Sequence, residues 1–210
     1  SPEETCSESL ASFKKFLCWE TDEWKDCGDV SILFYAVLRN DTEAVRLLIS
    51  GSSIGKDRIN AYVFEDGLVE FGIPARASAL FCAMAFASVN IVRILLESGA
   101  DPKISDMNGA DPLMYASTLG RVQNIKLWLS RFPKWTINRG MTMNGSTALH
   151  CAVFFGRNKL QTVQALVELG GADLNVLNHG GASVLSNAVN SVDSNVDVVR
   201  YLLSNMLKYG

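Results

Sequence analysis

Hydrophobic residues recur along the chain in two alternating types of segment. Five segments of the first type align, and each has a small polar or acidic residue first, a leucine third and an alanine sixth. They begin at Ser31, Ser78, Asp111, Thr147 and Ser183. A leucine and an alanine three residues apart share one face of a helix, and the small alanine lets a neighbouring helix approach closely. The pattern predicts five short helices with equivalent packing faces.

A second apolar segment follows each of these and starts with a β-branched residue. The second segments start at Val45, Val92, Ile125, Val163 and Val199, which is 12 residues after the leucine in the first three copies and 14 in the last two. Successive leucines are 47, 33, 36 and 36 residues apart. Periods of this size are typical of stacked units that cannot bury their apolar faces alone. We therefore expect an all-α solenoid of five helix-turn-helix repeats.

The connections between helices carry matching turn signals. Gly120 and Gly156 follow the first helices of repeats three and four, where glycine commonly ends a helix. Repeats two and four close with ESGADPKI and LGGADLNV, in which a glycine ends the second helix and an extended stretch follows.

This repeat resembles the ankyrin repeat. TALHCAVFFG, from Thr147, matches the family's T-P-L-H-x-A-x-x-x-G element, and GADLN and GADPK match its G-A-D-V-N element. The resemblance covers about residues 30–204, although only His150 keeps the histidine, only Pro112 keeps the proline, and FPKWTIN replaces G-A-D-V-N in repeat three. It implies an ankyrin-repeat domain over residues 31–210 that binds a partner protein or peptide and is not an enzyme.

Residues 1–30 precede the repeats and contain a predicted helix. Leu10, Phe13 and Leu17 have the spacing of an amphipathic helix. We expect this segment to cap the exposed end of repeat one. A partner-binding helix, or a fragment of a preceding repeat, is the alternative.

An enlarged finger loop, about residues 52–77, separates repeats one and two. It is rich in aromatic and β-branched residues around Asp66 and Gly67, a tight-turn signal. The sequence predicts a β-hairpin finger with its tip at these two residues and with Tyr62, Phe64 and Phe71 along it. An insertion without function is the alternative, because long surface loops are entropically tolerable.

No catalytic or metal-binding pattern is present. The sequence lacks GxSxG, P-loop, HExxH and GxGxxG motifs. The five cysteines form no CxxC pair, and there are only two histidines, so we expect no metal and no cofactor. His150 and Cys151 are adjacent on a predicted helix and point about 100° apart, which prevents a catalytic pair. The resemblance implies instead that His150 hydrogen-bonds between repeats.

The resemblance places partner binding on the concave face, at the finger tips and at the C-terminal ends of the first helices. Candidate contact residues on these elements are Tyr62, Phe64, Phe71, Phe86, Met107, Asn108, Leu119, Trp135, Met143, Asn144, Phe155 and His179. Exposed apolar side chains there would form an interaction patch. The alternative for the apolar residues, Phe154 included, is burial between repeats.

Charge is segregated along the chain. Residues 112–167 contain no acidic residue and seven bases, whereas the first 30 residues hold eight acids and three bases. The bases are Arg121, Lys126, Arg131, Lys134, Arg139, Arg157 and Lys159. Such a basic patch would steer an acidic partner, with an exposed Trp135 as an anchor. Ordinary solvated bases on the convex face are the alternative. The pI of about 5.4 and the lack of a DNA-reading motif argue against nucleic acid.

Three functions remain open from the sequence. The chain is expected to be a scaffold or adaptor module, a regulatory domain of a larger enzyme or membrane protein, or a binder of acidic, phosphorylated or lipid-headgroup ligands. No run is apolar enough for a membrane span, and unpaired cysteines favour the cytoplasm or nucleus. We expect a monomer or part of a larger chain. Met206 and Leu207, near the end of repeat five, indicate either a packed cap or a following repeat.

Overall fold

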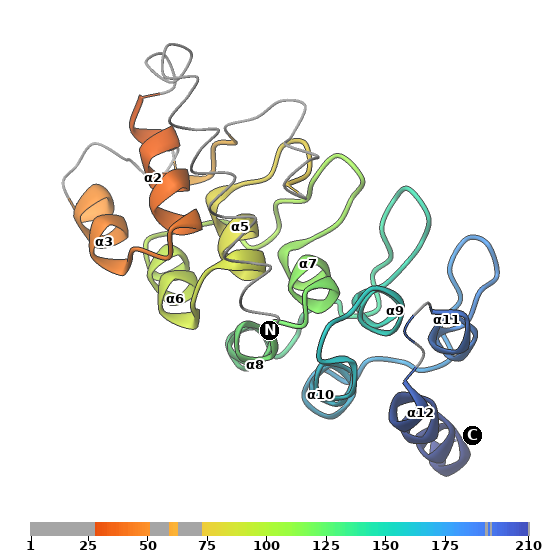
Figure 1. The fold of residues 1–210 in the computed structure, drawn as a ribbon. Helices are drawn as coiled ribbons and strands as arrows, with labels where there is room; N and C mark the ends of the chain where they lie inside the picture. Colours follow the sequence, from red (N-terminus) through yellow and green to blue (C-terminus); the bar gives the residue numbers. More distant parts are fainter. Residues whose placement is uncertain (1–27, 51–58, 63–72, 192, 194, 210) are drawn as a thin grey trace. The chain divides into compact units, whose positions relative to one another are not determined.

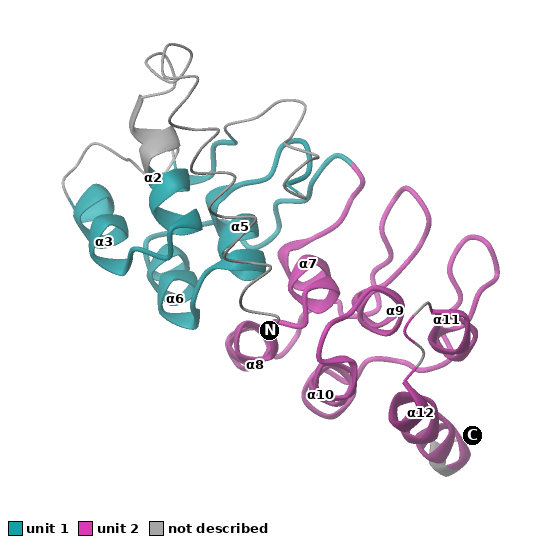
Figure 2. Cartoon of the chain, in the orientation of Figure 1, with its two compact units in different colours: residues 1–107 teal, residues 108–210 magenta. Residues whose placement is uncertain are grey.

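The computed structural model describes residues 28–50, 59–62, 73–191, 193 and 195–209. The predicted N-terminal helix, the hairpin tip at Asp66 and Gly67, and the candidate residues Phe64 and Phe71 lie outside this part of the chain. The chain divides into two compact units, residues 1–107 and residues 108–210, shown in two colours in Figure 2. We call them unit 1 and unit 2 and describe each by itself.

The described part of unit 1 contains two helix pairs. α2 (Gly28–Leu38) pairs with α3 (Thr42–Ser50), and α5 (Ala79–Phe86) pairs with α6 (Val89–Glu97), as Figure 1 shows. α2 packs on α5, and α3 packs on α6, so that first helices contact first helices and second helices contact second helices. The turn after α2 is tied to the turn before α6, because the Ser88 N–H donates to the Asn40 side chain at 2.7 Å.

The residues described in unit 2 form three helix pairs. The first helices are α7 (Pro112–Thr118), α9 (Ala148–Phe154) and α11 (Val184–Asn190). The second helices are α8 (Val122–Arg131), α10 (Lys159–Gln164) with its π-helical continuation η3 (Ala165–Leu169), and α12 (Val196–Tyr209). α9 packs between α7 and α11, while α8 contacts η3 and α10 contacts α12 (Figure 1). The predicted fold of all-α, ankyrin-like helix pairs is confirmed.

The repeated polar residue at the start of each first segment has a defined structural role. Ser78, Asp111, Thr147 and Ser183 are the N-caps of α5, α7, α9 and α11, and each side chain accepts a backbone N–H from three residues further on. A side-chain acceptor at this position satisfies an amide that has no partner within the helix. The leucine and alanine of each segment then fall on the buried face, as their spacing predicts; Leu185 alone is only half-buried.

The described residues form no β-strand, and isolated bridges join Tyr62 with Ser78 and Leu177 with Ser183. The first bridge closes the base of the enlarged finger. Asn60 beside it accepts the Asp101 N–H at 2.7 Å, so the base of this finger is attached to the turn that follows α6. The hairpin itself stays a prediction, because its tip lies among the residues that are not described.

Trp135 is a correction to the sequence analysis, which expected it to be exposed. It is half-buried, and its ring lies 5.0 Å from that of the fully buried Trp128 and 5.7 Å from that of Phe132. The reason is the short turn after α8, in which the Trp135 N–H donates to the Phe132 carbonyl at 3.0 Å and folds the chain back onto the helix. Trp135 therefore packs against the buried Trp128 of unit 2, and whether it contacts a partner stays a prediction.

Candidate partner-binding surface

The fingers of unit 2 are hydrogen-bonded to one another through their backbones. The Asn108 carbonyl accepts the Thr142 hydroxyl at 2.9 Å and the Met143 N–H at 3.3 Å. The Asn144 carbonyl accepts the His179 N–H at 2.9 Å. Three successive fingers are thus joined in register, which fixes the spacing of whatever their tips present to a partner.

A glycine follows each of the two asparagines, Asn108 and Asn144, and the hydrogen bonds between the fingers require it. Gly109 and Gly145 have φ values of +76° and +71°, which favour glycine. A Cβ atom on Gly109 would lie 2.5 Å from Thr142 Oγ1, and one on Gly145 would lie 2.5 Å from His179 Cδ2. The next finger therefore passes too close for any side chain.

The finger tips expose methionine and histidine side chains. Met143 and His179 are exposed in unit 2, and Met107 is exposed in unit 1. Asn108 and Asn144 are half-buried, and the Asn144 side chain accepts the Ser146 N–H at 2.9 Å within its own turn. These two asparagines shape the fingers, whereas the neighbouring Met143 and His179 side chains are available for contact.

The C-terminal end of α9 carries the largest aromatic side chains that the described part of unit 2 exposes. Helix α9 is buried from Ala148 to Val153, yet Phe155, the residue after its last turn, is 65% exposed. Its ring packs edge-on against the exposed ring of Phe154, with centroids 4.7 Å apart. This exposed aromatic pair at the end of an otherwise buried helix is a candidate for contact with a partner.

The equivalent ends of the other first helices are less exposed. Leu119, after α7, is half-buried, and so is Phe86, at the end of α5 in unit 1. The turns after α7 and α9 are held together, since the Asn158 side chain donates to the Gly120 carbonyl at 3.3 Å. Leu119 and Phe155 therefore belong to adjacent, fixed turns of unit 2.

In unit 1, Tyr62 is exposed at the base of the enlarged finger. The Arg76 guanidinium lies over its ring, 5.3 Å from the centroid.

His150 is buried and hydrogen-bonds between two repeats, as the resemblance of the sequence to the ankyrin repeat implies. Nδ1 accepts the Thr147 N–H at 3.3 Å and lies 2.9 Å from the Thr147 hydroxyl, and Nε2 lies 3.2 Å from the Ala182 carbonyl of the next repeat. With Nδ1 accepting, the proton is on Nε2, which donates to that carbonyl. Burial lowers the pKa of His150, and the Ala182 carbonyl partly opposes this shift. The neutral imidazole, with its proton on Nε2, is the form that makes both hydrogen bonds.

Arg139 does not belong to a solvated basic surface. Its guanidinium donates to the Gly109 carbonyl at 3.0 Å and to the Asp111 carboxylate at 3.5 Å. Burial raises the pKa of Asp111, and the Met114 N–H, Arg139 and Trp135 oppose this rise. The acid-free stretch of residues 112–167 begins directly after Asp111. The carboxylate that pairs with Arg139 therefore lies one residue outside the stretch from which the basic patch was predicted.

Lys159 is the second correction to the predicted basic patch. It is buried at the start of α10, and its Nζ donates to Ser191 Oγ at 2.7 Å and to the Asp193 carbonyl at 2.9 Å. Both acceptors lie in the connection between α11 and α12, which Lys159 attaches to the preceding repeat. Of the other predicted bases, Lys126, Arg131, Lys134 and Arg157 are exposed and Arg121 is half-buried.

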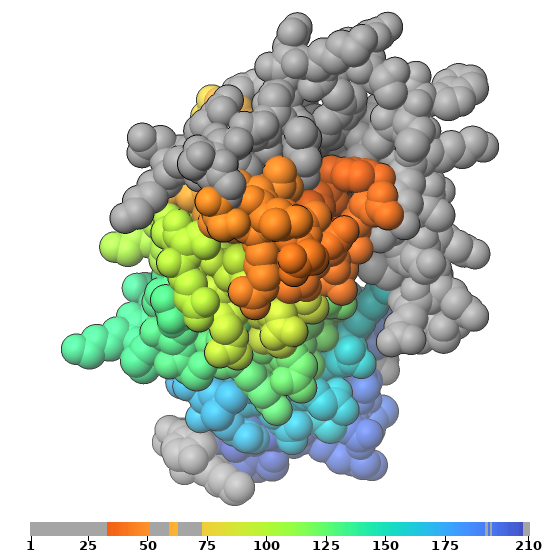
Figure 3. Space-filling view, turned by 90° about the vertical axis from the view of Figure 1, so that its left-hand side faces the viewer, coloured from red at the N-terminus to blue at the C-terminus, as the bar shows by residue number. Residues whose placement is uncertain are grey.

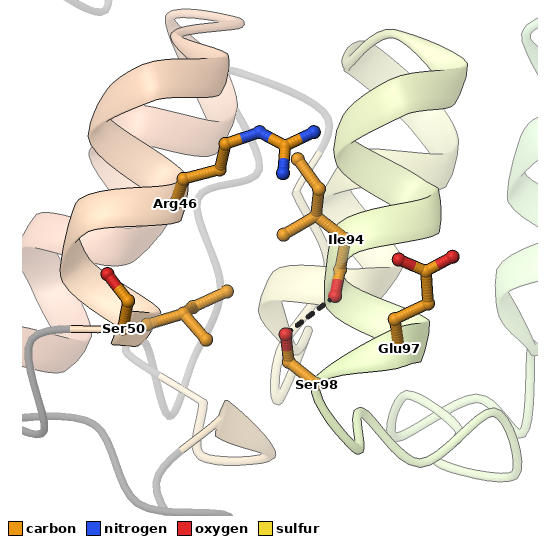
Figure 4. Close-up of a pocket in the computed structure, with 6 residues that line it drawn as sticks. Arg46, Ser50, Ile94, Glu97 and Ser98 are labelled. Carbon is orange, nitrogen blue, oxygen red and sulfur yellow. Dashed lines mark hydrogen bonds between the residues drawn. The ribbon is translucent and has the colours of Figure 1, made fainter.

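A shallow hollow of about 270 Å³ lies between α3 and α6 in unit 1, on the face where these helices lie side by side in Figure 3. Ile49 and Ile94 give it apolar walls, and Arg46, Glu97, Ser50 and Ser98 give it a polar rim (Figure 4). The Ser98 hydroxyl donates to the Ile94 carbonyl at 2.7 Å and so serves its own helix end.

The residues that the structure describes contain no cluster of metal-ligating side chains. Cys82 and Cys151 are buried free thiols, and burial raises the pKa of both, which suppresses the reactive thiolate. In the same part of the chain, no helix has both the length and the apolar character needed to cross a membrane.

The sequence analysis missed several exposed apolar residues of unit 2. They are Leu169, Leu177, Val189, Val196 and Leu203. Val189 occupies a repeat position whose equivalents in the other four repeats are buried, so its residue type gave no signal.

Comparisons with known proteins agree with the fold. A sequence profile of ankyrin repeats (3 copies) matches residues 5–106, 33–139 and 113–209, which together span nearly the whole chain. A putative ankyrin repeat protein of Acanthamoeba polyphaga mimivirus is 25% identical over 189 residues, which is 85% of this chain and 27% of that relative. The chain thus spans about a quarter of that relative's length.

Proposed function

The chain belongs to the family of ankyrin-repeat proteins, and we propose that it binds a partner protein or peptide through the finger tips and first-helix ends of unit 2. Ankyrin repeats generally mediate protein–protein interactions. The surface proposed here consists of Leu119, Met143, Phe154, Phe155 and His179, and we call it the aromatic surface.

The exposed pair Phe154 and Phe155 is the observation that carries this proposal. Burial of a phenylalanine side chain contributes about 1.5–3 kcal/mol, and aromatic residues are enriched among the residues that dominate binding energy. Met143 adds a flexible, polarisable side chain that adapts to differently shaped partners. The hydrogen bonds between successive fingers hold Met143 and His179 in place and so lower the conformational entropy lost on binding.

The charge of unit 2 supports an acidic partner. Residues 108–210 contain nine Lys and Arg against five Asp and Glu, although the whole chain has a net charge of −3. Arg139 and Lys159 are engaged within the fold, but Lys126, Arg131, Lys134 and Arg157 are exposed. A field of this sign accelerates the association of an acidic partner and weakens with added salt.

The binding proposal is tested by capture of partners from a native lysate on immobilised wild-type protein and on two variants. Phe155→Ala removes the centre of the aromatic surface. Leu169→Ala removes an equally exposed apolar side chain from η3, outside that surface. Proteins retained by wild type and by Leu169→Ala, but lost with Phe155→Ala, are the expected result. Equal recovery with both variants would show that the aromatic surface is not the binding site.

The charge of the partner has its own test. Lys126→Glu with Arg131→Glu reverses two exposed charges on α8 without touching the aromatic surface. For an acidic partner, association should slow and its dependence on salt should decrease. Unchanged association rates would remove the acidic partner from the proposal and leave the aromatic surface in place.

A further inference from the structure

The hollow between α3 and α6 combines an apolar floor with a charged rim. Its lining residues, three from each helix, are Arg46, Ile49, Ser50, Ile94, Glu97 and Ser98. α3 packs on α6, so the two helices hold these side chains at a fixed spacing. All of them belong to the described part of unit 1, and none belongs to the aromatic surface.

The hollow has the size of a single side chain. Its volume of about 270 Å³ is below the roughly 300–1,000 Å³ of pockets that enclose a whole small molecule. Ile94 is 7% exposed and Ile49 is half-buried, so the walls are apolar. An apolar side chain that enters the hollow would remove its own surface and part of the isoleucine surface from water.

The two serine hydroxyls of the hollow are used within their own helices. Ser98 Oγ donates to the Ile94 carbonyl at 2.7 Å, and Ser50 Oγ donates to the Leu47 carbonyl at 3.4 Å. Their protons are therefore not offered to a ligand. Polar recognition at the rim depends on the two charged residues.

Arg46 and Glu97 supply one positive and one negative charge from opposite helices. Both are exposed, and the Arg46 side chain extends from α3 toward α6, as Figure 4 shows. Within the described part of the chain, neither side chain forms an ion pair. The rim therefore presents a cation on the α3 side and a carboxylate on the α6 side to whatever occupies the hollow.

We propose that the hollow holds one apolar side chain of an extended partner segment that has an acidic residue on one side of it and a basic residue on the other. The acidic residue faces Arg46, and the basic residue faces Glu97. Charge complementarity of this kind selects the partner and its orientation more than it raises affinity.

The dimensions of an extended segment fit this arrangement. Residues i−2, i and i+2 of such a segment lie on one side and are about 7 Å apart. The axes of packed helices are about 8–10 Å apart. A segment that crosses from α3 to α6 can therefore place residue i in the hollow and residues i−2 and i+2 within reach of the long Arg46 and Glu97 side chains.

Short peptides with this pattern test the proposal directly. The probes are acetyl-Glu-Gly-Leu-Gly-Lys-amide and its counterpart in reversed order, added to the full chain while the isoleucine methyl signals are followed by NMR. At least one probe should shift the signals of Ile49 and Ile94, with a dissociation constant in the millimolar range, because exposed ion pairs contribute little.

Two altered peptides separate the apolar contribution from the charges. Alanine in place of the leucine should weaken binding about tenfold, and glutamine in place of both charged residues should weaken it about threefold or more. The absence of shifts at Ile49 and Ile94 at about 10 mM peptide, or equal affinity for the glutamine peptide, would overturn the proposal.

A charge reversal tests the role of Arg46. Arg46→Glu should change the preferred probe to acetyl-Lys-Gly-Leu-Gly-Lys-amide, because two carboxylates then flank the hollow. Arg93→Glu is the matched control: it removes the exposed base at the equivalent position of α6, outside the hollow, and should keep the wild-type preference. Circular dichroism should show that both variants are folded.

Glu97→Lys is the reciprocal variant and should favour acetyl-Glu-Gly-Leu-Gly-Glu-amide. An unchanged peptide preference in both Arg46→Glu and Glu97→Lys, or an equal change in Arg93→Glu, would contradict the assignment. This proposal is independent of the aromatic surface, because the probes are read out at isoleucines of unit 1 and loss of Phe155 should leave their binding unchanged.

Discussion

His150 gives the most specific stability prediction, because it is buried, joins two repeats and is one of only two histidines in the chain. His150→Ala removes the hydrogen bond from the Thr147 N–H to Nδ1 and the bond from Nε2 to the Ala182 carbonyl. Two hydrogen bonds contribute about 2 kcal/mol net. The cavity left by the ring adds at least about 1 kcal/mol. The free energy of unfolding should fall by about 3 kcal/mol in total.

The same residue predicts a pH dependence of stability. Burial lowers the pKa of His150 in the folded chain, whereas the pKa in the unfolded chain is about 6.5. The unfolded chain therefore binds the proton more readily, and stability decreases as the pH falls below about 6.5 towards the folded pKa. Above that window the neutral ring contributes its full stabilisation. Protonation would also place a second N–H on Nδ1, opposite the Thr147 N–H.

Urea denaturation followed by tryptophan fluorescence, at pH 7.5 and pH 5.5, measures both effects. Trp128 is fully buried and reports unfolding of unit 2. His179→Ala is the matched control: its side chain is exposed, so its stability and pH dependence should match wild type within about 0.5 kcal/mol. The reasoning is refuted if His150→Ala is as stable as this control, or if it keeps the wild-type loss of stability between the two pH values.

Further substitutions test the other structural assignments. Lys159→Ala should destabilise the chain by about 2 kcal/mol, because the Ser191 hydroxyl and the Asp193 carbonyl lose their charged hydrogen-bond donor. Lys126→Ala, at an exposed residue, should change the denaturation midpoint little. Gly145→Ala should destabilise by at least about 1 kcal/mol in thermal melts, because its positive φ and the adjacent finger exclude a methyl group. Trp135→Ala should destabilise by about 2 kcal/mol through its aromatic contacts, and loss of partner binding without loss of stability would restore it as an anchor.

Much of the fold follows from local sequence. The residue at the start of each first segment is an N-cap because serine, threonine and aspartate side chains can accept an amide of the first turn, a property that needs no tertiary contact. The leucine and the alanine three residues later share a helical face by geometry alone. The length of the repeat and the positions of its first helices were therefore predictable from the sequence.

The corrections concern contacts between distant residues. Trp135 follows Lys134 in a polar turn, and only its distance from Trp128 shows that it is part of the core. Lys159 is held by neutral groups 32 and 34 residues away, so charge patterning gave no signal of its burial. Val189 has the residue type expected of a buried position, and its exposure depends on whether another element covers it.

The candidate surface was predicted in part. The sequence identified Phe155 and Met143 by their repeat positions, and both are exposed. It did not distinguish them from Leu119 and Phe86, which are half-buried, because exposure at a helix end depends on how the neighbouring turns pack. Whether these residues contact a partner stays a prediction.

Site-specific photo-crosslinking tests the central claim most directly. A photoreactive phenylalanine analogue in place of Phe155 should crosslink a partner protein in native lysate, and the same analogue in place of Leu169 should not. An excess of unlabelled wild-type protein should compete for the partner and abolish the crosslink. Crosslinking at Leu169 with none at Phe155, or a crosslink at Phe155 that wild-type protein fails to compete, would contradict partner binding at the aromatic surface.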